Sequence, residues 1–300
     1  MLVRETYPNK DVAALLTKSF VSIKVDAEKG NGPDLKKQYD VNGFPTLLIV
    51  DAMGEELDRI VGYRPPEKFI AELKPVLEGK SFAALKKRVT ENPSDFEAAF
   101  LLAKKFQDRG DYPKAEDLFK RLLGAEKAPA SLRDRAEGGI ALAAFYKSGG
   151  KEVAAVQKYF DKKLDSGDAI DHAQVLFDYH QKSKNTEKVA QAADYLIRHG
   201  FEKDAEFLNN YAWYLASHGE GAKKALELAK KAVDLSPKSS HILDTLAEAY
   251  RQNGLHREAV LTQKKAVELA PDTNQRSLLE KRLDAFQKAL EESEKKTKEF

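Results

Sequence analysis

The chain has 300 residues, 42% of them hydrophobic and 33% charged, which is enough apolar material for a buried core and enough length for two domains. Its 50 basic and 48 acidic residues are interspersed and leave a net charge of +2, so nothing favours nucleic acid or an anionic membrane as a partner. Cysteine is absent, which excludes a disulfide framework, a thiolate nucleophile and a sulfur-ligated metal in this chain.

Residues 1–79 predict an α/β domain. Val21, Ile23 and Val25 alternate along one expected strand, and the wholly apolar run 47–50 predicts another strand, buried on both faces of a sheet. The elements expected in chain order are a strand at 20–25, a helix at 35–39, strands at 47–50 and 56–61 joined by a turn at 51–54, and a helix at 66–77.

Short motifs along this region resemble the second half of a thioredoxin-like domain. In chain order they are Phe20-Val21, Val25-Asp26, Tyr39-Asp40-Val41, Gly43-Phe44-Pro45-Thr46, Asp51 with Gly54, and Gly62-Tyr63. Gly-Phe-Pro-Thr is the most specific of them, and the resemblance covers about a quarter of the chain. It implies a cis peptide bond at Pro45, in a loop of Phe44, Pro45 and Thr46 whose backbone pairs with an extended peptide.

The family's CxxC segment is the largest departure from this resemblance. It would lie just before a helix that includes Val3 and leads into 12–16, but the chain begins at Met1. A central strand between those at 20–25 and 46–50 is therefore missing. Two explanations stay open: Met1 is an internal methionine wrongly taken as the start, which we favour, or the chain is a truncation that repairs its sheet by re-pairing. As written, one strand edge lacks a neighbour, and self-association through that edge is a hypothesis.

A helical hairpin recurs near the C-terminus, where Pro237 and Pro271 are 34 residues apart. Small residues in this segment let two antiparallel helices approach closely, larger ones fill the space between them, and glycine lets the chain turn. Counted from Ser240 as position 1, positions 4, 7, 8, 11, 15, 20, 27 and 32 are Leu243, Leu246, Ala247, Tyr250, Gly254, Ala259, Ala266 and Pro271. This pattern resembles a tetratricopeptide repeat.

Further repeats precede this one. Matching positions start at Phe96 and Ala205, less regular helical hairpins are expected at 131–165 and 170–200, and 274–294 predicts a terminal capping helix. The expected fold class is α/β plus all-α: a partial thioredoxin-like domain at 1–79, a helical linker at 80–94 and a helical solenoid of the tetratricopeptide type at 95–300.

The repeat resemblance also implies a binding groove. In that family, positions 2, 5, 9, 12 and 13 of each first helix point away from the interhelical core and line a concave surface. Those expected here to contact a partner are Asn209, Trp213, Ser217, Asp244, Glu248 and Arg251. Trp213, the only tryptophan, is either a peptide anchor or a packing residue between repeats. Asp244 and Glu248 argue against a clamp for a partner's C-terminal carboxylate.

No pattern indicates catalysis or a cofactor. The six histidines lack metal-ligand spacing. The glycines at 149–150 and 219–221 lie at expected helix-hairpin turns and not in a phosphate-binding loop. We therefore expect no catalytic residue, no metal and no cofactor.

The sequence predicts protein–protein interaction as the function, with a redox-inactive scaffold binding a protein or peptide in the repeat groove. The alternative is a thiol–disulfide oxidoreductase, acting in cell redox homeostasis, whose CxxC segment lies upstream of Met1 and whose repeats select clients. A redox-inactive adaptor that uses Phe44 and Pro45 is a third reading. The chain has no apolar run of the roughly 18 to 20 residues that span a bilayer and no signal sequence. It is expected in the cytoplasm as written, or in the periplasm or outside the cell if a leading segment is missing.

Overall fold

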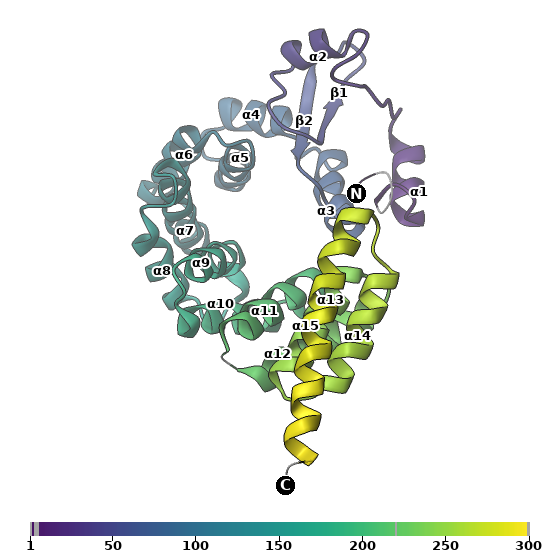
Figure 1. Ribbon diagram of the computed structural model, residues 1–300. Coiled ribbons are helices and arrows are strands. Elements are labelled where there is room, and N and C mark those ends of the chain that lie inside the picture. The colour runs from purple at the N-terminus through teal and green to yellow at the C-terminus, as the bar shows by residue number, and fades with distance from the viewer. Residues whose placement is uncertain (1, 3–5, 220, 299–300) are drawn as a thin grey trace. The chain divides into compact units, whose positions relative to one another are not determined.

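The computed structural model describes residue 2 and residues 6–219 and 221–298 (Figure 1). It forms two compact units, one extending to Tyr159 and the other starting at Phe160. Helices dominate both units, and the only sheet among the described residues lies near the N-terminus. No helix in the described ranges is both long and apolar enough to cross a bilayer.

The N-terminal α/β part packs helices against a two-stranded antiparallel sheet. Its elements are α1 (Lys10–Ser19), α2 (Gly32–Gln38), β1 (Thr46–Val50), β2 (Glu56–Val61) and α3 (Pro66–Leu77). The Asp51 carboxylate closes the turn between the strands, because it accepts hydrogen bonds from the amides of Met53 at 2.8 Å and Glu55 at 2.9 Å. The buried core includes Val12, Ile49, Ile60, Phe69 and Leu73.

The strand predicted at 20–25 is wrong. These residues form no regular structure, and the side chains of Val21 and Ile23 are 92% and 81% exposed. The physical reason is pairing: a strand is stable only beside a neighbour that satisfies its backbone groups, and β1 pairs with β2 alone in the described residues. Val3, which the sequence predicts to lie in a helix, is outside the described residues.

The prediction that residues 47–50 are buried on both faces is also wrong. Ile49 is buried, but Leu47 and Leu48 are half-buried and Val50 is exposed. The Gly62 amide donates to the Pro45 carbonyl at 2.8 Å, so Pro45 and Gly62 form a hydrogen-bonded pair. Hydrogen-bonded and non-hydrogen-bonded pairs alternate along an antiparallel ladder, so the backbone N–H and C=O groups of Leu48 face away from β2. The outward edge of β1 therefore has no backbone partner among the described residues, as the sequence predicted.

The rest of the chain consists of helices that pair in antiparallel hairpins. They are α4 (Phe82–Glu91), α5 (Phe96–Asp108), α6 (Tyr112–Gly124), α7 (Ala130–Lys147), α8 (Val153–Lys162), α9 (Ile170–Lys182), α10 (Thr186–Arg198), α11 (Ala205–His218), α12 (Ala222–Leu235), α13 (Ser240–Gln252), α14 (His256–Glu268) and α15 (Thr273–Lys298). Both helices of each predicted irregular hairpin form, and α9 packs against α10. The capping helix is confirmed, and Figure 1 shows α13, α14 and α15 side by side.

Local sequence fixes where many of these helices begin. Asp95, Asp111, Asn185 and Asp204 precede α5, α6, α10 and α11, and each side chain accepts a hydrogen bond from a first-turn amide of its helix. Between α13 and α14, Gly254 adopts a φ of +74°, which favours glycine and turns the chain back. The hairpin boundaries therefore follow from capping and turn residues.

Small side chains set the distance between paired helices. Ala247 on α13 and Ala259 and Ala266 on α14 are fully buried, as the repeat pattern predicted. Between α6 and α7 the approach is closer still, because a Cβ atom on Gly139 would lie 2.5 Å from Cε2 of Phe119. The phenyl ring therefore occupies the space that any larger residue at position 139 would need.

We expect Gly139→Ala to lower the free energy of unfolding by roughly 1–3 kcal/mol because it overpacks this contact. The direction is informative, since alanine stabilises an open helix position by about 1 kcal/mol over glycine. Gly124→Ala is the matched control, because a Cβ atom there meets nothing within 4 Å. Urea titration followed by circular dichroism measures both variants, and equal stability would contradict the close approach.

Candidate functional site

A buried carboxylate joins the sheet to the first helical hairpin within the first unit. Asp58 on β2 is 1% exposed and forms ion pairs with Lys105 at 2.6 Å and with Arg109 at 3.4 Å. It also accepts a hydrogen bond from the backbone amide of Phe82 at 3.2 Å. A single side chain therefore binds residues from α4, from α5 and from the end of α5.

Glu56 extends this network on the same strand. It pairs with Arg109 at 2.8 Å and accepts a hydrogen bond from Nε of Arg59 at 2.9 Å. Burial opposes ionisation of Glu56, but Arg59 and Arg109 outweigh it and lower the pKa of Glu56. The guanidinium carbon of Arg109 also lies 3.7 Å from the ring centroid of Phe82. Ion pairs therefore hold the junction together, and each buried charge in them has a counter-charge beside it.

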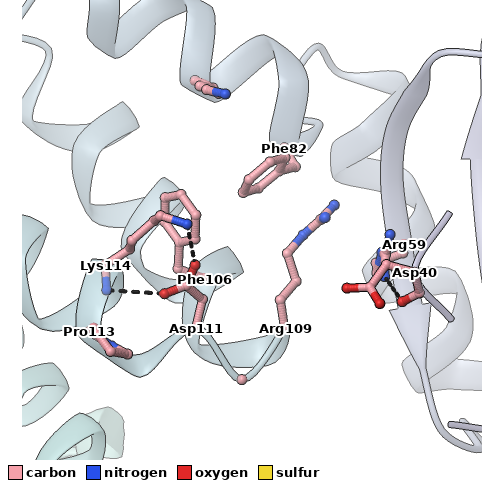
Figure 2. Close-up of a pocket in the computed structure, with 10 residues that line it drawn as sticks. Asp40, Arg59, Phe82, Phe106, Arg109, Asp111, Pro113 and Lys114 are labelled. Atoms are coloured by element: carbon pink, nitrogen blue, oxygen red, sulfur yellow. Dashed lines mark hydrogen bonds and ion pairs between the residues drawn. The ribbon is translucent and has the colours of Figure 1, made fainter. Parts of the chain in front are cut away.

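A cleft of about 680 Å³ opens beside this junction (Figure 2). Figure 2 shows Phe82, Phe106 and Arg109 on one side of it and Asp40 and Arg59 on the other. The lining residues are Asp40, Arg59, Phe82, Lys86, Phe106, Arg109, Gly110, Asp111, Pro113 and Lys114. Most of the charges are already paired, as in the 2.6 Å ion pair between Lys114 and Asp111. The cleft therefore offers little free charge to a ligand.

The predicted peptide-binding loop of the first unit lies at the start of β1. The Phe44–Pro45 peptide bond is cis, as the resemblance implied, and the Phe44 side chain is 63% exposed. Pro45 is exposed too, while the Thr46 hydroxyl donates to the Gly43 carbonyl at 2.7 Å and holds the loop. The loop thus presents an open aromatic side chain next to the unpaired edge of β1.

The predicted groove residues lie in the second unit, on α11 and α13. Trp213 is 36% exposed, and the guanidinium carbon of Arg282 on α15 lies 4.7 Å from its ring centroid. The indole ring is therefore neither buried between repeats nor free of contacts.

Arg282 also joins Trp213 to the two predicted carboxylates. Its Nε lies 3.0 Å from Oδ1 of Asp244, and its Nη2 lies 3.3 Å from Oε2 of Glu248. Burial raises the pKa of Asp244, although Arg282 opposes that shift. Burial acts on Glu248 as well, but hydrogen bonds from Arg251 and Gln252, with the charge of Arg282, lower its pKa. The network therefore keeps Glu248 ionised.

The structure does not join all six predicted groove residues. Trp213, Asp244, Glu248 and Arg251 form one network through Arg282. Asn209 and Ser217 have no contact with it: Oδ1 of Asn209 is buried and accepts no hydrogen bond, and the Ser217 hydroxyl donates to the Tyr214 carbonyl at 3.1 Å.

Sequence reasoning missed Arg282. It lies 34 residues after Glu248, so it occupies the same repeat position on α15, two helices further along the chain. The sequence predicts a capping helix there, and extending the count from Ser240 into that helix would find the residue. Asp58 carried no comparable signal, because one carboxylate among 48 acidic residues does not mark a junction.

Comparison with known proteins agrees with both parts of the chain. Residues 1–77 match the family model of a thioredoxin-like domain. The chain is a thioredoxin-like domain followed by helices of the tetratricopeptide fold. No curated protein matches the chain significantly in sequence.

Several solved structures of repeat proteins are similar to this chain, and the one with a TM-score above 0.5 supports the repeat fold. YrrB, described as a TPR protein with an unusual peptide-binding site, superposes with a TM-score of 0.51 at 17% identity, covering 66% of this chain and 98% of YrrB. MamA AMB-1 gives a TM-score of 0.46 at 18% identity over 58% of this chain and 91% of its own. BtubC from P. vanneervenii gives 0.45 at 17% identity over 69% and 94%. At these identities, the YrrB likeness establishes the fold alone.

We expect Asp58→Asn to lower the free energy of unfolding by about 3 kcal/mol, because it leaves Lys105 without its buried counter-charge and removes one of the two carboxylates that pair with Arg109. Asp117→Asn serves as the control, since Asp117 pairs with Arg121 on an exposed face of α6. That change is expected to cost about 0.5 kcal/mol or less. Urea midpoints measure both, and similar values would contradict a structural role for Asp58 in joining the thioredoxin-like domain to the repeats.

A second prediction concerns His241 and Glu206, which link α13 to α11 at 2.9 Å. The hydrogen bond that the His241 ring donates to the Glu206 carboxylate raises the pKa of His241 above its ordinary value. Because the raised pKa belongs to the folded state, the pair stabilises fully below about pH 6.5 and loses its contribution as pH rises through the raised pKa.

NMR titration of the histidine rings tests this pair. Glu206→Gln should return the pKa of His241 towards about 6.5. His180 is the internal control, because burial, aided by Lys188, lowers its pKa independently of Glu206. A His241 pKa that does not respond to the substitution would contradict the hydrogen bond.

Proposed function

We propose that this protein is an interaction scaffold whose repeat helices bind a segment of a protein partner. The proposed contacts lie in the groove of α11 and α13 and are Asn209, Trp213, Ser217, Asp244, Glu248 and Arg251. In this proposal residues 1–79, 80–94 and 95–300 act as thioredoxin-like domain, helical linker and repeat domain. The partner is a protein or peptide and not nucleic acid or membrane, because basic and acidic residues are interspersed along the chain.

The observation that carries this proposal is the state of Trp213. Its ring is part exposed and has a fixed neighbour in Arg282, which itself is held by Asp244 and Glu248. A large side chain that is already ordered loses little entropy on binding, so it suits a binding hot spot. YrrB, which has a similar repeat fold, is described as having a peptide-binding site.

The thioredoxin-like domain contributes a second contact in this proposal and no redox chemistry. Without cysteine the chain has no thiolate for disulfide exchange. Phe44, Pro45 and Thr46 still present an exposed loop beside the outward edge of β1. An extended segment could add to that edge through main-chain hydrogen bonds, and so could the same edge of a second copy.

A second candidate is a thiol–disulfide oxidoreductase formed by a longer protein. The unpaired edge of β1 favours it, because a strand leading into a CxxC segment would satisfy that edge. In-frame coding sequence ahead of Met1 that contains CxxC would support this candidate, with the repeats selecting clients. Its absence would leave the scaffold.

Site-specific photocrosslinking tests the groove. A crosslinker at position 217 on α11 is expected to give a discrete adduct with a partner in the native cell, and Trp213→Ala should reduce its yield about tenfold, as removal of a hot-spot side chain would. The matched control position is Lys264, which is exposed on α14. Circular dichroism confirms that each variant is folded.

Two results would count against the proposal. One is an adduct at position 264 as strong as that at 217. The other is an adduct at position 217 that does not depend on Trp213.

A further inference from the structure

Four alternate helices of the second unit, α9, α11, α13 and α15, place one residue each at repeat position 9. The register extends to α9 because positions 4, 7, 8 and 11 counted from Ile170 are all buried; they are Ala173, Leu176, Phe177 and His180. It extends to α15 because Asn274 lies 34 residues after Ser240. The row of position 9 is Asp178 on α9, Trp213 on α11, Glu248 on α13 and Arg282 on α15.

The chain itself shows which chemistry this row accepts. The guanidinium group of Arg282 lies over the Trp213 ring and within ion-pair distance of both Asp244 and Glu248. A planar cation is favoured here because an aromatic face and carboxylates attract it from different sides. Arg282 remains 29% exposed, so the cation is at the surface of the groove and not in a sealed core.

The carboxylates along this surface differ in whether they have a partner. Glu248 pairs with Arg251 and Arg282, Asp244 with Arg282, and Glu206 with His241. Asp178 is the exception among the described groove residues. It makes no hydrogen bond or salt bridge, and Lys182 on its own helix acts on it only through longer-range attraction.

Asp178 and Trp213 lie on helices that contact each other. The Phe177 and Tyr211 rings meet with centroids 5.9 Å apart, and the Gln181 amide approaches Oδ1 of Asn210 at 3.5 Å. Packed helices are about 8–10 Å apart between axes, so one long side chain between them can reach both residues. Asp178 is exposed on the surface of α9, and partial desolvation raises the pKa of its carboxyl group. A partly desolvated carboxylate gains more from a counter-ion than a fully hydrated one.

We propose that the groove selects a partner segment with an arginine or lysine side chain, which pairs with Asp178 and lies against the exposed part of Trp213. In this arrangement the partner's cation lies between the position 9 residues of α9 and α11, just as the guanidinium group of Arg282 on α15 lies beside the position 9 residue of α13. The inference rests on the proposed function and adds the chemical class of the segment.

Selection from a library of random peptides displayed on phage tests the inference with the full chain as target. Peptides selected on the wild-type chain should be enriched in arginine and lysine. Asp178→Asn keeps the side-chain shape and removes the charge, so it should weaken the selected peptides about tenfold or more. Asp178→Lys should reverse the preference towards aspartate and glutamate. Glu187→Gln, on the exposed surface of α10, is the control and should leave the selection unchanged.

The readout is direct because Trp213 is the only tryptophan in the chain. Selected basic peptides should change its fluorescence on binding, and the same peptides with citrulline in place of arginine should not. Thermal unfolding checks that both Asp178 variants are folded. Peptides without basic enrichment, or basic peptides that bind Asp178→Asn as tightly as the wild type, would overturn the inference. An adduct at position 217 that depends on Trp213 would then still support the proposed function.

Discussion

Close approach between antiparallel helices is the constraint on which the rest of this structure depends. Each hairpin buries a face that it cannot cover alone, and small residues at the crossing points let its two helices meet. Ala247 and Ala259 do this in the regular repeat, and Gly139 does it where the Phe119 ring leaves no room for a Cβ atom. Because stacking fixes how successive first helices follow one another, it also fixes the rows of side chains that line the proposed groove.

The thioredoxin-like domain shows what happens when a sheet lacks neighbours. Residues 20–25 have the composition of a strand but remain irregular, with Val21 and Ile23 exposed, because their backbone pairs with neither strand of the sheet in the described part of the chain. The two strands that do form are stabilised by contacts between β2 and the first helices of the repeats. Asp58 on β2 binds Lys105 and the Phe82 amide, so charge pairing with the first repeat adds to the burial of a small core.

The proposed groove of the second unit combines fixed and open positions. Arg282 forms ion pairs with Asp244 and Glu248 and lies over the Trp213 ring, while Asp178 at the next position of the same row makes no hydrogen bond or salt bridge among the described residues. Fixed groups lower the entropy cost of binding, and an open charge gives preference among partners. Binding strength and selectivity would therefore come from neighbouring steps of one row.

The helical hairpins, their boundaries and the β1–β2 hairpin follow from local signals in the sequence. These signals are a 34-residue spacing, capping aspartates, turn glycines and the Gly-Phe-Pro-Thr motif, whose proline is cis as the resemblance implied. Three features emerge only in the folded chain: residues 20–25 are not a strand, Asp58 is buried against Lys105, and Arg282 contacts Trp213. Each of these depends on residues far apart in the chain, and neither composition nor periodicity records whether a strand finds a neighbour or a charge finds its counter-charge.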